Sequence, residues 1–344
     1  MTGPLPRPRI ASIDLVRGVA VLSMLAAHFG PDGGIWALSE RLTAPLFATL
    51  VGVGVLLTWQ RRASTGWFFA DELYRAAILI ALGTVLQQLY WQIDVVLQTL
   101  GVLSIVMALL TWLLRGRTVP TVALAVGLAV TSPTVMDHAR AWLATGGSGL
   151  PLVNRVVELL FAGQAYRVMT FCVFALAGQA LLPWVTDPRR RPRALFVGAS
   201  MLALGTAVGF VVGKYVLGGA ESYSGTIGEI VTAVPMTLAV WTGCAWLVAM
   251  VPDRPWLTPL LATGRSSLTA YTVQILLARV LVDRVLHGAR QATWWMLLTQ
   301  VLVALLGSML WQRWLGFGPL EWVMRLPNRW RAGRMPQRAR PSPG

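Results

Sequence analysis

The chain has 344 residues, of which 56% are hydrophobic and only 12% are charged, and its mean hydropathy is +0.62. Soluble globular domains carry about twice that charged fraction, so the composition excludes an ordinary soluble protein and predicts an integral membrane protein. The net charge of +15 comes mainly from arginines in loops and in the C-terminal tail. Because anionic lipid attracts arginines at such places, we expect no nucleic-acid partner.

Apolar stretches long enough to cross a bilayer as helices recur along the whole chain. They are residues 12–29, 42–59, 73–90, 95–114, 119–136, 166–183, 193–217, 227–251, 268–286 and 293–315. A backbone that crosses lipid must satisfy its own hydrogen bonds. These stretches therefore predict an all-α integral membrane protein with about ten transmembrane helices.

The charges of the connections predict how these helices are oriented. Arginines gather in alternate connections, at Arg61 and Arg62, at Arg115 and Arg117, and in the run 189–191, whereas the intervening connections are mixed or acidic. By the positive-inside rule, this alternation places both termini in the cytoplasm. We therefore expect a multi-pass protein of the cytoplasmic (inner) membrane.

The same reading divides the chain into a polytopic transmembrane domain, residues 1–326, and a basic cytoplasmic tail, residues 327–344. The tail is rich in Arg and Pro, so we expect it to be disordered against anionic lipid of the inner leaflet. Residues 137–165 form the longest outer connection. Their amphipathic piece, residues 154–161, either lies along the membrane surface or roofs a cavity.

The first apolar stretch carries three ionisable residues, Asp14, Arg17 and His28. At about 100° per residue, the eleven residues from Arg17 to His28 make close to three turns, so both side chains lie on one helix face, about 16 Å apart along the axis. Asp14 precedes Arg17 by three residues and lies near the same face. Ionisable residues inside a membrane helix are costly, so they indicate a functional site.

Each of these residues has a structural interpretation beside the functional one. Arg17 either reaches the inner interface, paired with Asp14, or clamps a phosphate or carboxylate while Asp14 orients it. His28 is either a polar group at the outer interface or a general base, since imidazole titrates near neutral pH. Asp94 lies between the third and fourth apolar stretches, where it either orients His28 or caps a helix.

The spacing of Arg17 and His28 suggests a donor that enters from the cytosol. The pantetheine arm of coenzyme A, extended from phosphates to thiol, is about as long as the separation given by the helix rise. Phosphates held by Arg17 would leave a thioester beside His28. That geometry fits the transfer of an acyl group to an acceptor that reaches the site from outside.

These residues, with Gly18 directly after Arg17, resemble the transmembrane acyltransferase superfamily, which includes the acyltransferase type-three glycan O-acetyltransferases and the heparan-α-glucosaminide N-acetyltransferase family. Within it, the chain looks most similar to the bacterial YeiB-like membrane proteins. The resemblance continues in APLFATLVGVG at 44–54, DVVLQTLG at 94–101, GRSSLTAY at 264–271 and GPLEW at 318–322.

The resemblance implies ten or eleven helices, an acyl-CoA donor, His28 as general base and Arg17 as a contact to the donor phosphates. It does not identify the acceptor. One departure is the outer end of the second apolar stretch, where some relatives have further polar groups and this chain offers only Glu40 and Arg41.

Other residues complete the predicted site. Arg75 and Arg265 are expected at the cytosolic side, either as further contacts to the donor phosphates or as simple interface arginines. Serines and threonines beside Arg265 are expected to cap the helix that follows. Gln98 and Tyr271 are expected to line the pocket, although Gln98, like other glutamines in the apolar stretches, could instead bond a neighbouring helix.

Two further features receive structural interpretations. The Gly-x-Gly at Gly52 and Gly54 indicates close helix packing, because nothing before it forms the strand that a nucleotide-binding loop requires. The two cysteines, Cys172 and Cys244, lie in apolar runs, so we expect neither a disulfide framework nor a metal site.

The sequence thus supports a membrane acyltransferase that moves an acetyl or other short acyl group from cytosolic acyl-CoA to an envelope glycan, glycolipid or lipid-linked acceptor. The alternative is a small-molecule or lipid transporter with Asp14, Arg17 and His28 as the coupling site, although the chain has no evident inverted repeat. A non-catalytic scaffold is the third hypothesis. The acyl chain, the acceptor and a homodimeric assembly stay open.

Overall fold

The computed structural model describes residues 10–31, 36–62, 64–90, 92–251, 255–285 and 293–327, and in these ranges it is helical and has no strand. The helices are α1 (Ala11–Phe29), α2 (Ala37–Arg61), α3 (Thr65–Leu89), α4 (Leu97–Leu113), α5 (Thr118–Ala144), α6 (Pro151–Val157), α7 (Val168–Val185), α8 (Pro192–Tyr215), α9 (Ile227–Met250), α10 (Thr258–Arg265), α11 (Ser267–Arg284), α12 (Trp294–Leu302), α13 (Ser308–Trp314) and α14 (Pro319–Val323). Two π-helical segments, η2 (Glu158–Ala162) and η4 (Val303–Gly307), extend α6 and join α12 to α13, and the 3-10 turn η3 (Pro255–Leu257) precedes α10.

Every apolar stretch expected from the sequence is helical where it is described, and seven helices of the described residues are long and apolar enough to cross a membrane. These seven are α1, α2, α5, α7, α8, α9 and the continuous helix from Trp294 to Trp314. Of the rest, α4 is apolar but has only 17 residues, whereas α3 and α11 carry several charged residues that lower their hydropathy. The chain is therefore a multi-pass membrane protein, while the count of ten and the orientation of the termini stay predictions.

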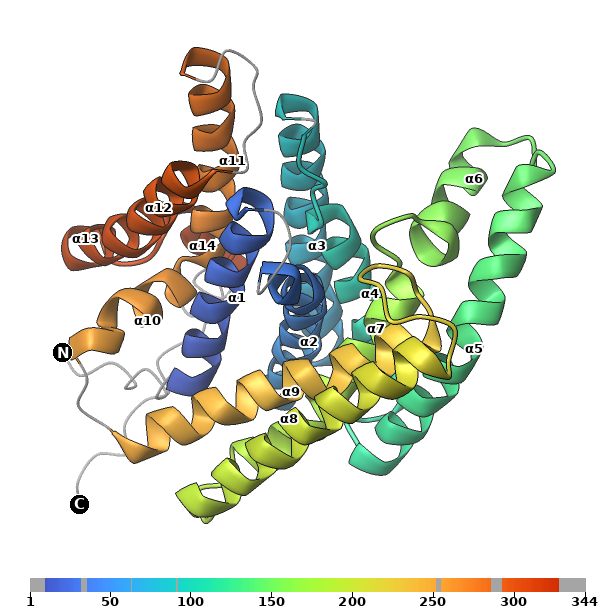
Figure 1. Ribbon diagram of the computed structural model, residues 1–344, viewed down its shortest axis with the longest axis horizontal. Coiled ribbons are helices and arrows are strands. Elements are labelled where there is room, and N and C mark those ends of the chain that lie inside the picture. Colours follow the sequence, from blue (N-terminus) through green and yellow to red (C-terminus); the bar gives the residue numbers. More distant parts are fainter. Residues whose placement is uncertain are drawn as a thin grey trace, which may run out of the picture.

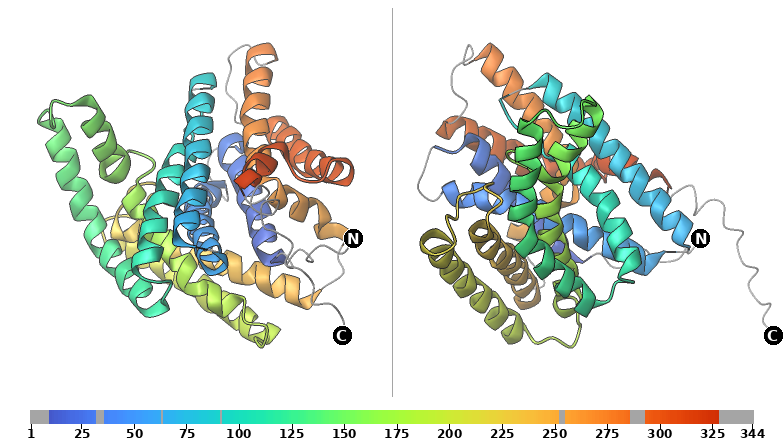
Figure 2. Two further views of the ribbon diagram at one scale, coloured as in Figure 1. Left: turned by 180° about the vertical axis from the view of Figure 1, so that it is seen from behind. Right: turned by 90° about the vertical axis from the view of Figure 1, so that its right-hand side faces the viewer.

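The helices surround α1 and α2, which lie near the middle of the bundle. Figure 1 shows α8 and α9 side by side and tilted relative to α1, α3 and α11, and the views in Figure 2 agree. The hairpin of α5 and α6 lies at one side of the molecule, and α10, α12 and α13 lie at the other (Figure 1). This arrangement puts α1 in contact with α2, α9, α10, α11 and α12.

Small and polar residues bring α2, α4 and α7 together. A Cβ on Gly52 would collide with the backbone of Ala175, and Gln179 donates from Nε2 to Thr111 Oγ1 at 2.7 Å and to the Gly52 carbonyl at 3.1 Å. Membrane helices commonly associate in this way, because lipid provides no hydrophobic drive between them. A Cβ on Gly54 would meet nothing within 4 Å of the described residues, so the packing interpretation holds for Gly52 and not for Gly54.

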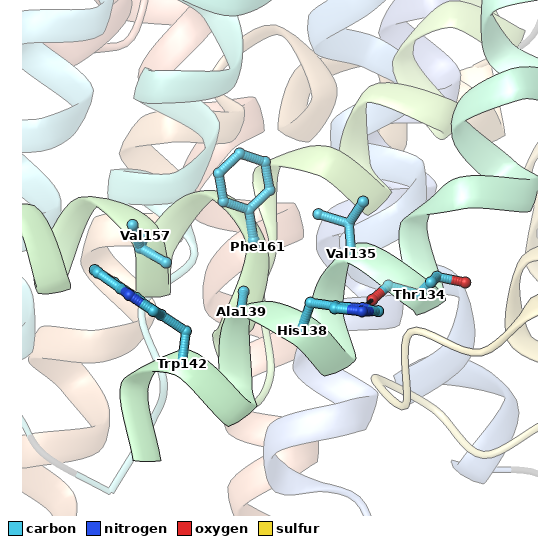
Figure 3. A pocket seen from close by; sticks show the side chains of 7 residues that line it. All are labelled: Thr134, Val135, His138, Ala139, Trp142, Val157 and Phe161. Atoms are coloured by element: carbon cyan, nitrogen blue, oxygen red, sulfur yellow. Dashed lines mark hydrogen bonds between the residues drawn. The ribbon is translucent and has the colours of Figure 1, made fainter. Parts of the chain in front are cut away.

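The connection predicted to lie outside the membrane contains a helical hairpin. The helix α5 continues to Ala144, eight residues beyond the predicted end at 136, and three glycines with positive φ turn the chain towards α6. The amphipathic piece predicted at 154–161 is helical, and falls in α6 and η2. Figure 3 shows an open groove between these segments and α5, lined mainly by apolar side chains such as Val135, Trp142 and Phe161.

Candidate functional site

Three of the four predicted donor-side residues lie together, although they come from two helices far apart in the sequence. Asp14 of α1 accepts from Arg265 Nε of α10 at 3.2 Å, and its other oxygen lies 3.9 Å from Arg17 Nη1. The carboxylate is almost buried, with 9% of the side chain exposed, whereas 38% of Arg17 and 37% of Arg265 are exposed. Asp14 thus holds two guanidinium groups that remain accessible from outside the bundle.

Two glycines allow this meeting of α1 and α10. A Cβ on Gly264 would collide with the Asp14 carbonyl oxygen, and a Cβ on Gly18 would collide with the Leu260 carbonyl oxygen. The helices therefore cross with their backbones in contact. Each glycine is the neighbour of one of the two arginines, so the close crossing directly sets the separation of the charged groups.

The charges of this cluster favour an anionic ligand. Two arginines and one aspartate leave one net positive charge, and among the described residues Asp14 accepts a hydrogen bond from Arg265 and pairs with Arg17 only as an ion pair. A guanidinium presents five N–H donors in a planar fork that matches phosphate and carboxylate oxygens. We therefore refer to Asp14, Arg17 and Arg265 as the arginine cluster.

The fourth predicted donor-side residue, Arg75, belongs to a different polar network. Its Nη1 lies 3.0 Å from Glu72 Oε1 and 3.0 Å from Thr58 Oγ1, and Ser104 donates to the other oxygen of Glu72 at 2.8 Å. This network joins α2, α3 and α4, and Glu72 is buried in it. Arg75 thus joins neighbouring helices, a role that the sequence did not indicate, and its contact to the donor stays a prediction.

The short helix α14 lies at the N-terminus of α11, directly after the arginine cluster. Glu321 accepts the backbone N–H groups of Leu268 and Thr269 at 2.7 and 3.1 Å, and the Thr269 hydroxyl at 2.6 Å. Ser266, by contrast, donates its hydroxyl to the Ala262 carbonyl and makes no capping bond. The expectation that the local serines cap α11 is thus wrong, because a carboxylate some fifty residues away takes that role.

His28 lies in the last turn of α1, the end predicted to be outside, on the face that also carries Arg17. Its Nδ1 is buried and has no hydrogen-bond partner among the described residues. One turn earlier on the same face, the Met24 sulfur accepts from Gln274 Nε2 of α11 at 3.3 Å, so α11 packs beside this face. Residues 32–35, which follow His28 closely in the chain, lie outside the described residues.

The connection between α3 and α4 places Asp94 and Tyr271 in one neighbourhood. Tyr271 is buried, and its hydroxyl accepts the Val96 N–H at 3.3 Å, while the Asp94 carbonyl accepts from the Tyr166 hydroxyl at 3.3 Å. The Asp94 side chain is exposed and does not cap α4, whose N-cap residue is Val96. No hydrogen bond joins Asp94 to His28 within the described ranges, so its role as the orienting partner stays a prediction.

Gln98 lies between two helices. Its Nε2 donates to Thr84 Oγ1 of α3 at 3.2 Å, on a partly exposed side of the α3–α4 pair. This bond agrees with the interhelical alternative given for the glutamines, and the pocket role of Gln98 stays a prediction.

Sequence reasoning missed a buried ion pair. Arg167, which directly precedes α7, and Glu229 of α9 are 2% and 6% exposed, and Arg167 Nη2 lies 4.0 Å from Glu229 Oε2. Two signals were present in the sequence: a basic residue at the start of an apolar run, and the Thr226-x-x-Glu229 pattern of a capping box. Thr226 does accept the Glu229 N–H at 3.1 Å.

Comparisons with known proteins support the motif-based resemblance. A family model described as heparan-alpha-glucosaminide N-acetyltransferase, catalytic, matches residues 9–151, and a model described as a protein of unknown function (DUF418) matches residues 183–330. Together they support an acyltransferase-like membrane family, as the motifs indicated. The first match contains Arg17, His28 and Asp94, and the second contains Arg265 and Tyr271.

A curated relative matches only part of the chain. It is the "Uncharacterized 39.9 kDa protein in amylase 3'region" of Bacillus acidopullulyticus, which is 33% identical over 97 residues. The match covers 27% of this chain and 28% of the relative. At the level of families, the matches point to a membrane acetyltransferase-like activity.

Proposed function

We propose that the protein is a membrane acyltransferase that moves an acetyl or other short acyl group from cytosolic acyl-CoA to an envelope acceptor. The acceptor is a hydroxyl or amine of a glycan, a glycolipid or a lipid-linked compound. The observation that carries the proposal is the polarity of α1, which has the arginine cluster near one end and, near the other, a buried imidazole nitrogen with no hydrogen-bond partner among the described residues.

In this proposal, the arginine cluster binds the phosphates of the donor. Arg17 and Arg265 belong to different helices, so their two guanidinium groups can approach one phosphate group from different directions. The separation of Arg17 and His28 along α1, about 16 Å by helix rise, leaves room for an extended pantetheine arm. The thioester carbon then lies near His28, in the outer half of the bundle.

The chemical step assigns His28 the role of general base. A neutral imidazole nitrogen accepts the proton of the acceptor hydroxyl or amine while that atom attacks the thioester carbon. The new acyl–oxygen or acyl–nitrogen bond forms, the carbon–sulfur bond breaks, and the CoA thiolate leaves with the bonding electrons and takes up a proton. A buried nitrogen without a partner costs about 1–3 kcal/mol, which a bound acceptor would offset.

Other predicted residues support this step. Asp94 is the proposed orienting group for His28 once substrates are bound, and Tyr271 holds the neighbouring backbone at Val96. The proposal keeps both termini in the cytoplasm and the basic tail, residues 327–344, on anionic lipid of the inner leaflet. The protein would thus take its donor from one side of the cytoplasmic membrane and its acceptor from the other.

The test uses the full chain in lipid nanodiscs with radiolabelled acetyl-CoA and extracted envelope glycolipids. We expect His28→Ala to abolish transfer while CoA still binds, and Arg17→Ala to weaken CoA binding about tenfold, because one charge-assisted contact is lost. His138→Ala and Arg117→Ala are matched controls, since both replace exposed residues outside the site.

The outcomes separate the hypotheses. If an active preparation transfers label equally well with His28→Ala and Arg17→Ala, the assignment of the site is wrong. Flux of a substrate across proteoliposomes without CoA, lost with Arg17→Ala, would instead support the transporter.

A further inference from the structure

Tyr223, in the connection between α8 and α9, is held on both sides of its backbone. Its N–H donates to Glu229 Oε1 at 2.8 Å, and its carbonyl accepts from Arg167 Nη2 at 2.7 Å. Glu229 also accepts the Gly225 N–H at 2.6 Å, and Arg167 also donates to the Gly163 carbonyl at 2.7 Å. The buried ion pair therefore fixes the backbone of Tyr223 between α8 and α9, and it joins this connection to Gly163 in the connection before α7.

The backbone of Tyr223 is strained. Its φ is +63°, in the left-handed region that residues with a Cβ rarely adopt. Such a conformation persists only when surrounding bonds determine it, and it is found preferentially at functional sites. Because glycine would adopt the same φ without strain, the presence of tyrosine here indicates a use for the aromatic side chain.

The ring of Tyr223 contacts Tyr166, which is hydrogen-bonded to the segment of Asp94 on the predicted acceptor side of the site. It packs edge-to-face on Tyr166 with ring centroids 5.6 Å apart, and the Tyr166 hydroxyl donates to the Asp94 carbonyl. The pKa of Tyr223 is raised by burial and by the nearby Tyr166, Glu40, Glu229 and Tyr271. Tyr223 therefore keeps its hydroxyl proton. It lies half-buried near Tyr166, which bonds the segment of Asp94, and near Tyr271.

We infer that Tyr223 is a positioning residue for the acceptor side, where Arg167 and Glu229 fix its backbone and its ring sets Tyr166 and the segment that carries Asp94. The inference deepens the proposed function and rests on it. Among the contacts of the described residues, none joins the buried pair to the donor cluster, which lies on α1 and α10. Loss of the pair should therefore weaken use of the acceptor and leave binding of the donor unchanged.

The experiment combines kinetics with hydrogen exchange on the full chain in nanodiscs. Glu229→Gln replaces one carboxylate oxygen by an N–H donor, so either Tyr223 or Gly225 loses its acceptor. We expect faster exchange in residues 92–96 and 219–226, an acceptor KM raised about tenfold, and an unchanged KM for acetyl-CoA. Glu158→Gln is the matched control, because that carboxylate is exposed and pairs only with Arg155 among the described residues.

Two substitutions of Tyr223 separate the side chain from the backbone. Tyr223→Gly removes the ring and the strain, whereas Tyr223→Ala removes the ring and keeps the strain. We expect both to raise the acceptor KM and the exchange of residues 92–96, with Tyr223→Gly the more stable protein. A Tyr223→Gly variant with the KM and exchange of the unmodified protein would overturn the inference, because the ring would then have no role.

The two arms also separate this inference from the proposed function. If the unmodified protein transfers no acyl group, the proposed function fails, and the exchange of residues 92–96 still tests the positioning. If transfer occurs but Glu229→Gln changes neither exchange at 92–96 nor the acceptor KM, only the positioning role is wrong.

Discussion

At the scale of single residues, Gly18 and Gly264 control the arginine cluster more directly than any charged neighbour. Each lies where a Cβ would overlap a backbone oxygen of the opposite helix, and a backbone cannot move aside as a flexible side chain can. The Gly264 contact involves the carbonyl of Asp14 itself. A methyl group at this position must therefore push α10 away from the residue that joins the two arginines.

Gly264→Ala should damage both stability and donor binding. Overpacking of this kind costs about 1–3 kcal/mol, and separation of the helices lengthens the 3.2 Å bond between Arg265 and Asp14. We expect a lower thermal midpoint and weaker binding of CoA. Gly54→Ala is the control, because its Cβ enters open space and alanine favours a helix by about 1 kcal/mol. Equal behaviour of the two variants would contradict this account of the crossing.

At the scale of elements, α14 serves as a cap for α11. A helix N-terminus leaves backbone N–H groups without partners and carries a partial positive charge, which a carboxylate complements. Glu321 supplies that carboxylate from a helix of five residues, which is also tied to α3 by the bond from the Tyr74 hydroxyl to the Val323 carbonyl at 3.0 Å. Glu321 thus takes the N–H groups at the N-terminus of α11 that could otherwise bind a donor phosphate. In the proposed function, Arg17 and Arg265 therefore make the contacts to the donor.

Glu321→Gln should loosen α11 at this end. The amide keeps one acceptor oxygen but loses the negative charge, so we expect a loss of about 1 kcal/mol, as for other capping residues. Hydrogen exchange at Leu268 and Thr269 should be faster, which can be measured by NMR or mass spectrometry. Glu221→Gln, at an exposed position between α8 and α9, should leave both amides unchanged. Protection equal to that of the unmodified protein would show that the cap is not needed.

The elements also show what the sequence could and could not predict. Apolar length predicted where the helices lie, and periodicity predicted that Arg17 and His28 share a face, because both are local properties. The helix α5 extends beyond the predicted apolar stretch, since residues 137–144 include three polar side chains that end the stretch, while their alanines and Leu143 still favour a helix. The bond between Asp14 and Arg265 spans 251 residues, and no local pattern indicates which helices meet.

At the scale of the whole molecule, the open question of topology concerns α3, α4 and α11. Charged residues lower the hydropathy of α3 and α11, yet Glu72 of α3 is buried in a hydrogen-bonded network rather than exposed to lipid. Ionisable groups in membrane helices are tolerated where they face protein partners. The ten-span arrangement, with these three helices also crossing the membrane, is therefore physically consistent.

Accessibility of single introduced cysteines tests that arrangement. Both native cysteines, Cys172 and Cys244, are buried, so an added thiol at an exposed position should dominate labelling by a membrane-impermeant maleimide. In intact cells, we expect Ser148→Cys in the hairpin between α5 and α6 to be labelled. We expect Thr65→Cys at the start of α3 to be labelled only after permeabilisation. These two positions calibrate the outer and inner sides.

Asp94→Cys and Val285→Cys then report on the less apolar helices, since both positions are exposed at the ends of those helices. If α3, α4 and α11 cross the membrane, both thiols react in intact cells, as Ser148→Cys does. Protection of Asp94→Cys until permeabilisation would mean that α3 and α4 return on the cytosolic side, away from an external acceptor. Protection of Val285→Cys would mean the same for α11. The labelling thus tests directly whether Asp94 lies on the side of the membrane from which the proposed mechanism brings its acceptor.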